Sequence, residues 1–94
     1  MIENIKTYQL LLSGRVQGVG FRYFVESIAG RYGINGFVRN TFDRKVEVVC
    51  QGEEEDLKKF ADEIKKGPSF SVVTDVKAEE IKDGKIYNIF EIKF

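Results

Sequence analysis

The chain contains no histidine and no tryptophan, and it has only one cysteine and one proline in 94 residues. Without histidine it lacks the side chain that most often acts as a general base and as a zinc ligand. We therefore expect no metal site and no metal-dependent hydrolysis, and nothing else in the sequence calls for a cofactor. The single cysteine, Cys50, cannot form a disulfide within the chain, and its place in an apolar strand pattern predicts a buried thiol.

The chain also has no excess of charge of either sign. Fifteen Lys and Arg balance fifteen Asp and Glu, so no overall basic field exists to collect nucleic acid. An anion would have to be bound by a local site. We expect a small-molecule partner and no nucleic acid.

Long hydrophobic runs are missing as well. The first ten residues, MIENIKTYQL, lack the basic start and apolar run of a signal peptide, and no apolar stretch approaches the length of a membrane span. We expect a cytoplasmic protein with no membrane partner. The length suits one small domain over residues 1–94, acting as a monomer, and no repeat, low-complexity tract or linker interrupts it.

Alternating apolar residues indicate strands. Over residues 5–13, Tyr8, Leu10 and Leu12 recur at every second position, and Leu11 on the opposite face is typical of a central strand. Four further strands are expected: a short one with Phe37 and Val38 that ends near Asn40, one with Val46, Val48 and Cys50, one over Val72 to Ile81, and one in which Phe90, Ile92 and Phe94 alternate. The few residues between the second and third strands predict a hairpin.

Two segments carry the spacing of amphipathic helices. The apolar positions of the first are Phe21, Phe24, Val25, Ile28, Ala29 and Tyr32, and those of the second are Leu57, Phe60, Ala61 and Ile64. Gly33 should end the first helix in a left-handed conformation, and Gly67-Pro68 should close the second. The resulting order, β-α-β-β-α-β with one more strand, predicts an α+β fold. We expect the ferredoxin-like split βαβ sandwich, with an antiparallel sheet covered on one face by two helices and an extra C-terminal strand.

The junction between the first strand and the first helix reads GRVQGVGFR, residues 14–22. Helix N-termini expose unpaired N–H groups and attract anions, and Gly14, Gly18 and Gly20 permit backbone turns that would add further N–H groups. Arg22 stands in the first helical turn, where a cation faces the positive end of the dipole unless an anion is bound. These residues alone leave two interpretations open, an anion site or an ordinary glycine-rich turn with a solvated arginine. The glycine spacing fits neither the Walker loop nor the dinucleotide fingerprint.

The same nine residues resemble the signature of the acylphosphatase family, G-x-V-Q-G-V-x-F-R. A second stretch, GINGFVRNT at residues 33–41, is similar to that family's G-x-x-G-[WF]-V-x-N. Further matches are Val46-Glu47-Val48, Gly67-Pro68 and the terminal pattern Tyr87-x-x-Phe90-x-Ile92. The resemblance spans essentially the whole chain.

The resemblance implies an enzyme that hydrolyses carboxyl phosphates such as acetyl phosphate to a carboxylate and inorganic phosphate. It implies that Arg22 and Asn40 are catalytic. It also implies that the phosphate is bound by the backbone amides of residues Val16, Gln17, Gly18, Val19, Gly20 and Phe21.

Other residues near these motifs have weaker assignments. Gln17 would also shape the loop, and Thr41 is a weak candidate for orienting Asn40, while Arg15 and Arg39 are expected to be solvated. The family commonly has Asp-Gly in the hairpin after the asparagine, whereas Phe42-Asp43-Arg44-Lys45 contains no glycine. That departure leaves the hairpin conformation open.

The implied chemistry is consistent with the missing histidine. A carboxylate is a good leaving group and needs little protonation, so catalysis rests on positioning and charge stabilisation. A guanidinium can hold two phosphoryl oxygens in a planar fork, and loop amides can hold the others. Asn40 cannot act as a base, but its amide can hold a water in line with the phosphorus, and a substrate oxygen would then accept the proton.

Two other functions remain as alternatives. The first is a module that binds phosphate or carbamoyl phosphate without turnover, as acylphosphatase-like segments can within larger maturation proteins. The length of the chain disfavours this function, because nothing follows residue 94. The second is a single-stranded RNA reader, which zero net charge and inward-facing aromatics disfavour. No pocket for the acyl group can be identified from the sequence.

Overall fold

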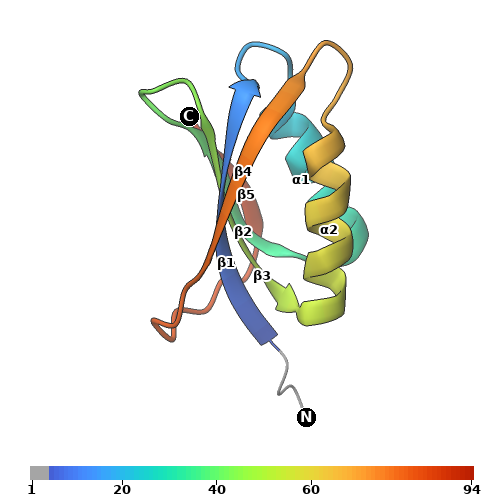
Figure 1. Cartoon of the computed structure of the whole chain (residues 1–94). Coiled ribbons are helices and arrows are strands. Elements are labelled where there is room, and N and C mark those ends of the chain that lie inside the picture. The colour runs from blue at the N-terminus through green and yellow to red at the C-terminus, as the bar shows by residue number, and fades with distance from the viewer. Residues whose placement is uncertain (1–4) are drawn as a thin grey trace.

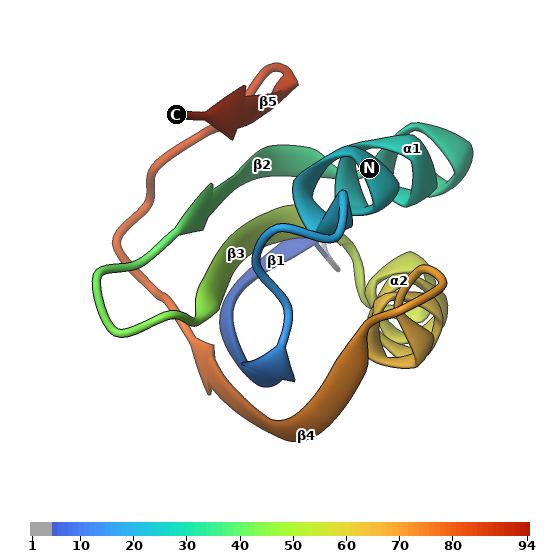
Figure 2. The same cartoon turned by 90° about the horizontal axis from the view of Figure 1, so that it is seen from above.

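The computed structural model describes residues 5–94. Its elements follow the predicted order: β1 (Ile5–Arg15), α1 (Phe21–Tyr32), β2 (Asn35–Asn40), β3 (Val46–Glu53), α2 (Glu54–Lys66), β4 (Val72–Glu80) and β5 (Phe90–Lys93). The strands form one sheet in the order β4-β1-β3-β2-β5, and both helices lie on the same face of it (Figure 1). Seen from above, the sheet curves around the helix pair (Figure 2). The predicted two-layer sandwich is confirmed.

Strand pairing follows the expectation for four strands and differs for the fifth. β1 is central and pairs antiparallel with β3 and β4, and β2 pairs antiparallel with β3. β5 pairs parallel with β2, with Gly36 opposite Phe90, so the sheet is mixed and not wholly antiparallel. The reason is the connection after β4, which carries the chain from one sheet edge to the other, where the neighbouring strand runs in the same direction as β5.

The core lies between the sheet and the helices. Its fully buried side chains include Phe21 and Val25 of α1, Phe60 and Ile64 of α2, and Leu12 of β1. Burial of one such side chain stabilises the fold by about 1.5–3 kcal/mol, so the two apolar stripes account for the docking of both helices. Gly33 ends α1 at φ 66°, the left-handed conformation that was predicted.

The last residue departs from the predicted alternation. β5 ends at Lys93, and Phe94 is 88% exposed and does not join the core as an alternating strand residue would. Its ring instead lies near α1, with its centroid 6.5 Å from that of Tyr23.

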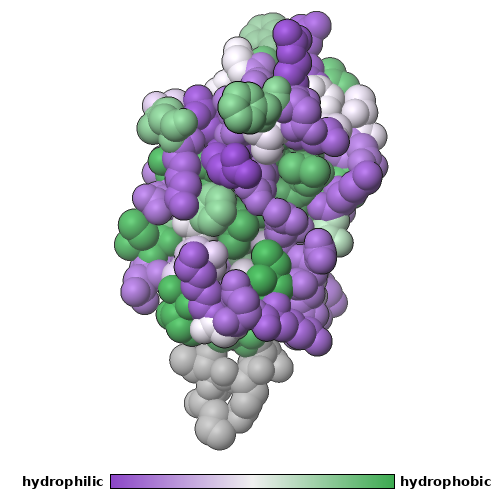
Figure 3. Space-filling model, turned by 90° about the vertical axis from the view of Figure 1, so that its left-hand side faces the viewer, coloured by the Kyte–Doolittle hydropathy of each residue, from purple (hydrophilic) through white to green (hydrophobic). Residues whose placement is uncertain are grey.

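The sheet face away from the helices is covered in part by the segment between β4 and β5. Gln51 holds this segment by donating to the Lys85 carbonyl at 2.7 Å and accepting from the Tyr87 amide at 2.9 Å. The Tyr87 ring lies 6.2 Å from the ring of Phe37, and the Lys93 ammonium stands 4.1 Å over Phe37. Figure 3 shows this face, where apolar side chains form small groups separated by polar ones.

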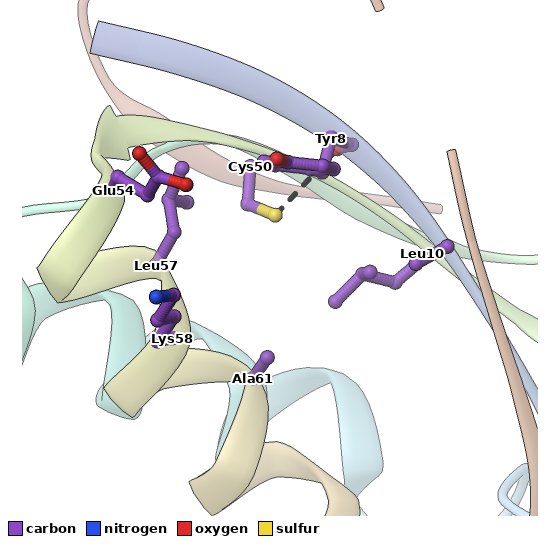
Figure 4. A pocket seen from close by; sticks show the side chains of 8 residues that line it. Tyr8, Leu10, Cys50, Glu54, Leu57, Lys58 and Ala61 are labelled. Carbon is purple, nitrogen blue, oxygen red and sulfur yellow. Dashed lines mark hydrogen bonds between the residues drawn. The ribbon is translucent and has the colours of Figure 1, made fainter. Parts of the chain in front are cut away.

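Cys50 is buried, as predicted. It is 2% exposed, its Sγ donates to the Tyr8 carbonyl at 3.5 Å, and burial raises the pKa of its thiol to about 12 (Figure 4). It lines an apolar cavity of about 160 Å³ between α2 and the sheet, where the small side chains of Ala61 and Ala78 leave space. This cavity offers almost no polar groups to a phosphate. Within residues 5–94, no helix combines the length and the apolar character needed to cross a bilayer.

Candidate active site

The loop between β1 and α1 is anchored in the core at both of its ends. Val16 and Phe21 are each 1% exposed, whereas Gly18 and Gly20 between them are exposed. Gly14 begins the turn at a β-bulge with φ 119°, and a Cβ there would lie 2.1 Å from the Val72 carbonyl oxygen. Residues 16–20 therefore form an exposed loop between two buried side chains, and we call this loop the arch.

The arch presents backbone amides that have no protein partner. Gly18 and Gly20 have φ of 73° and 76°, and a Cβ on either would meet nothing within 4 Å, so the backbone conformation and not crowding requires glycine. In the described part of the chain, no protein acceptor receives a hydrogen bond from the amides of residues 17–20. The first bond of α1 runs from the Phe24 amide to the Gly20 carbonyl, and no side chain caps the helix. The unpaired N–H groups and the helix dipole make this end attractive to an anion.

Arg22 lies in the first turn of α1 and is held by the C-terminal strand. Its Nη1 donates to the Lys93 carbonyl at 3.3 Å, and its guanidinium carbon lies 4.8 Å from the centroid of the Phe94 ring. Sequence reasoning placed Arg22 correctly at the helix start but missed these two contacts. The bond to Lys93 involves a backbone carbonyl, which has no signature in the sequence. The contact with Phe94 arises because β5 ends at Lys93, so that Phe94 is not a strand residue.

Asn40 is the last residue of β2 and meets the arch at the same end of the sheet. Its Oδ1 is buried and has no hydrogen-bond partner among residues 5–94. A cavity of about 120 Å³ is lined by Asn40 together with Val16, Gly18, Gly20, Phe21, Arg22 and Tyr23. The structure thus brings together Arg22, Asn40 and most of the predicted loop. The side chain of Val19 packs against the core.

Gln17 ties the arch to the hairpin that follows Asn40. Its Nε2 donates to the carbonyls of Thr41 at 3.0 Å and Lys45 at 2.8 Å. Both bonds lie outside the cavity, so the Gln17 side chain shapes the loop, and only its amide remains a candidate for phosphate binding. Since Asn40 adjoins Thr41, these bonds also fix the position of Asn40 relative to the arch.

The hairpin closes without glycine. Arg44 takes the left-handed conformation itself, at φ 67°, and the Thr41 amide donates to the Lys45 carbonyl at 2.9 Å. The Thr41 hydroxyl donates to the Asp43 carboxylate, which lowers the pKa of Asp43, and accepts from the Lys45 amide at 3.0 Å. The Thr41 hydroxyl thus bonds within the hairpin and not to Asn40.

Arg39, which was expected to be solvated, forms an ion pair with Glu47 on the open sheet face. The other carboxylate oxygen of Glu47 accepts a hydrogen bond from Gln9. The Arg39 guanidinium therefore belongs to the polar surface of that face, and Arg39 does not line the cavity.

The chemistry available in the cavity follows from its lining. The lining residues with polar side chains are Arg22, Tyr23 and Asn40, and no Asp or Glu is among them. Among residues 5–94, no three side chains of the metal-ligating type come together. Such a lining can bind an anion and orient a water, but it holds no group suited to general base catalysis near neutral pH.

Comparison with known proteins agrees with this geometry. The family model Acylphosphatase matches residues 8–92. An acylphosphatase of Bacillus licheniformis is 48% identical over 87 residues, which cover 93% of this chain and 97% of that protein. The crystal structure of acylphosphatase from Bacillus subtilis superposes with a TM-score of 0.91 at 38% identity, covering 95% of this chain and 99% of that one.

A longer protein contains a similar domain. The crystal structure of full-length HypF in the phosphate- and nucleotide-bound form matches with a TM-score of 0.84 at 35% identity, and the match covers 96% of this chain but 12% of HypF. The matches over nearly the full length of the relatives confirm the resemblance found in the two signature stretches, and the enzyme class that it implied. The chain belongs to the acylphosphatase family.

Proposed function

We propose that this enzyme hydrolyses acyl phosphates to a carboxylate and inorganic phosphate in the cavity bounded by residues 16–21, Arg22 and Asn40. The observation that carries the proposal is that loop amides without partners among residues 5–94, Arg22 and Asn40 meet around one small space. Its volume of about 120 Å³ is close to that of cavities of about 150 Å³ that hold a benzene molecule, which is room for a phosphoryl group and an attacking water.

The phosphoryl group would be held by the arch and by Arg22. Amides of the arch and of the first turn of α1 donate to its oxygens, and the helix dipole adds to the attraction. Arg22 uses one N–H on the Lys93 carbonyl, and its other donors remain available for a two-point contact with the phosphoryl oxygens. Fixed donors of this kind stabilise the charge that develops on the equatorial oxygens during phosphoryl transfer.

The attacking water would be held by Asn40. Asn40 lines the cavity, and its side-chain amide would hold that water and orient it toward the phosphorus. Neither Asn40 nor Arg22 takes the proton, which passes to a phosphoryl oxygen of the substrate. The departing carboxylate needs no acid, which suits a cavity without one.

The monomeric state and the cytoplasmic location expected from the sequence stay predictions. A second candidate function, a module that holds phosphate or carbamoyl phosphate without turnover, is favoured by the likeness to one segment of HypF.

Turnover separates the two functions. We expect wild-type protein to hydrolyse acetyl phosphate and benzoyl phosphate, to leave p-nitrophenyl phosphate nearly untouched, and to keep its full rate in excess chelator. The reason is that a site without an acid or a metal can expel only a good leaving group. Comparable turnover of the aryl ester, or a loss in chelator that added metal restores, would contradict the mechanism. Phosphate binding without acyl phosphate hydrolysis would support the binding module.

A further inference from the structure

A second pocket adjoins the cavity. It has a volume of about 620 Å³, against about 120 Å³ for the cavity, and Val16 and Gly18 line both spaces. Its other lining residues are Gly14, Arg15, Gln17 and Arg44. The arch therefore forms a wall shared by a small space that contains Arg22 and Asn40 and a larger, open space beside the hairpin.

The charge of the second pocket is entirely positive. Neither Arg15 nor Arg44 pairs with a carboxylate or donates a side-chain hydrogen bond within residues 5–94, and no acidic residue lines the pocket. Other cations in and next to the hairpin are neutralised, since Arg39 pairs with Glu47 and Lys45 with Asp43 at 3.6 Å. Among the cations of the hairpin and of the loop that faces it, Arg15 and Arg44 are thus the ones without a carboxylate partner within residues 5–94, and both line the pocket.

The backbone of Arg44 adds a second observation. Its φ of 67° lies in the left-handed region, which glycine adopts without strain and a long side chain does not. The hairpin thus carries an arginine at a position where backbone geometry alone would favour glycine. Because strained positions are retained where a side chain serves a function, Arg44 is a candidate for binding.

We propose that the pocket of Arg15 and Arg44 binds a second anionic group on the acyl part of the substrate. The enzyme then favours acyl phosphates whose acyl group carries a carboxylate or a phosphate. The inference rests on the proposed function, in which the phosphoryl group is bound in the small cavity and the acyl group lies beyond it. An acyl group that passes over the shared wall of Val16 and Gly18 would enter this larger, cationic space.

Two rigid substrates of nearly equal size test this preference. We would measure kcat/KM at low salt for 4-carboxybenzoyl phosphate and 4-methylbenzoyl phosphate, which differ in the distal charge. For wild type we expect a preference of about 10-fold for the carboxylate, the size expected from two exposed charge pairs acting together. The preference should fall at high salt, since exposed charges are screened.

The double variant Arg15→Gln/Arg44→Gln should bring the ratio of the two kcat/KM values close to one while phosphate still inhibits with its wild-type Ki. The matched control is Lys59→Gln/Lys77→Gln, which removes the same charge from exposed residues that line neither space. This control should keep the wild-type ratio. Circular dichroism would confirm that both variants are folded.

The outcomes are distinct for the two proposals. If wild type hydrolyses neither substrate, the proposed function fails and this inference fails with it. If wild type hydrolyses both equally well, only the inference is overturned. It is also overturned if the arginine variant loses both substrates and phosphate affinity in proportion, because the arginines would then serve the phosphoryl group itself.

Discussion

Replacing Arg22 with lysine should lower kcat/KM for acetyl phosphate by on the order of 10²-fold or more, although the positive charge is kept. An ammonium cannot contact two phosphoryl oxygens through a planar fork, and it cannot donate to the Lys93 carbonyl at the same time in the geometry seen here. Steady-state kinetics on the two proteins would measure the effect.

Binding linkage provides an independent check on Arg22. Inorganic phosphate should raise the Tm of the wild type and raise that of Arg22→Lys much less, because a ligand stabilises the folded state according to its affinity. Arg31→Lys is the matched control, since Arg31 lies in the last turn of the same helix and pairs with Glu63. Equal phosphate-induced shifts for wild type and Arg22→Lys would place the anion elsewhere.

Asn40→Ala should reduce kcat by on the order of 10²-fold or more while leaving the Ki of inorganic phosphate nearly unchanged. The proposal assigns Asn40 to the water and not to the phosphoryl group. The loss of its side chain should therefore weaken transition-state stabilisation and leave phosphate binding nearly unchanged. The Oδ1 of Asn40 has no hydrogen-bond partner among residues 5–94, so removing it breaks no hydrogen bond in the described part of the fold. Measurement of kcat and Ki in the same preparation tests both halves of the expectation.

Asn40→Asp serves as the charged counterpart of the alanine variant. It keeps the size and one acceptor oxygen but loses the NH₂ donor and places a negative charge beside the bound anion. Both phosphate affinity and turnover should therefore fall. If Asn40→Ala instead loses phosphate binding in proportion to activity, Asn40 is a phosphate ligand and the assignment to the water is wrong.

The parts of the fold that depend on local pattern could be predicted. The apolar stripes that include Val25 and Phe60 predict both helices and the faces that they bury. Gly33 ends α1 because glycine readily adopts the left-handed conformation found there. The direction of β5 could not be predicted, because it depends on where the segment between β4 and β5 reaches the far edge. That path depends on Gln51, whose contacts with the segment join residues distant in the sequence.

The candidate site divides in the same way. The position of Arg22 at the helix start and of Asn40 at the strand end follow from motif and periodicity, because each depends on its neighbours in the chain. The two bonds from Gln17 to the hairpin and the contact of Arg22 with Lys93 depend on how the loop, hairpin and C-terminal strand meet. The left-handed conformation of Arg44 contradicts the local preference, so no rule based on its side chain would predict it.

The central claim is that the amides of the arch and of the first turn of α1 bind the phosphoryl group. Titration of ¹⁵N-labelled wild-type protein with inorganic phosphate, followed by amide chemical shifts, tests it most directly. We expect the largest changes at residues 17–22, which comprise the loop amides without an acceptor among residues 5–94 and the start of α1, and a Kd that agrees with the inhibition constant. Largest changes elsewhere, for example only around Arg15 and Arg44 or along α2, would contradict the account.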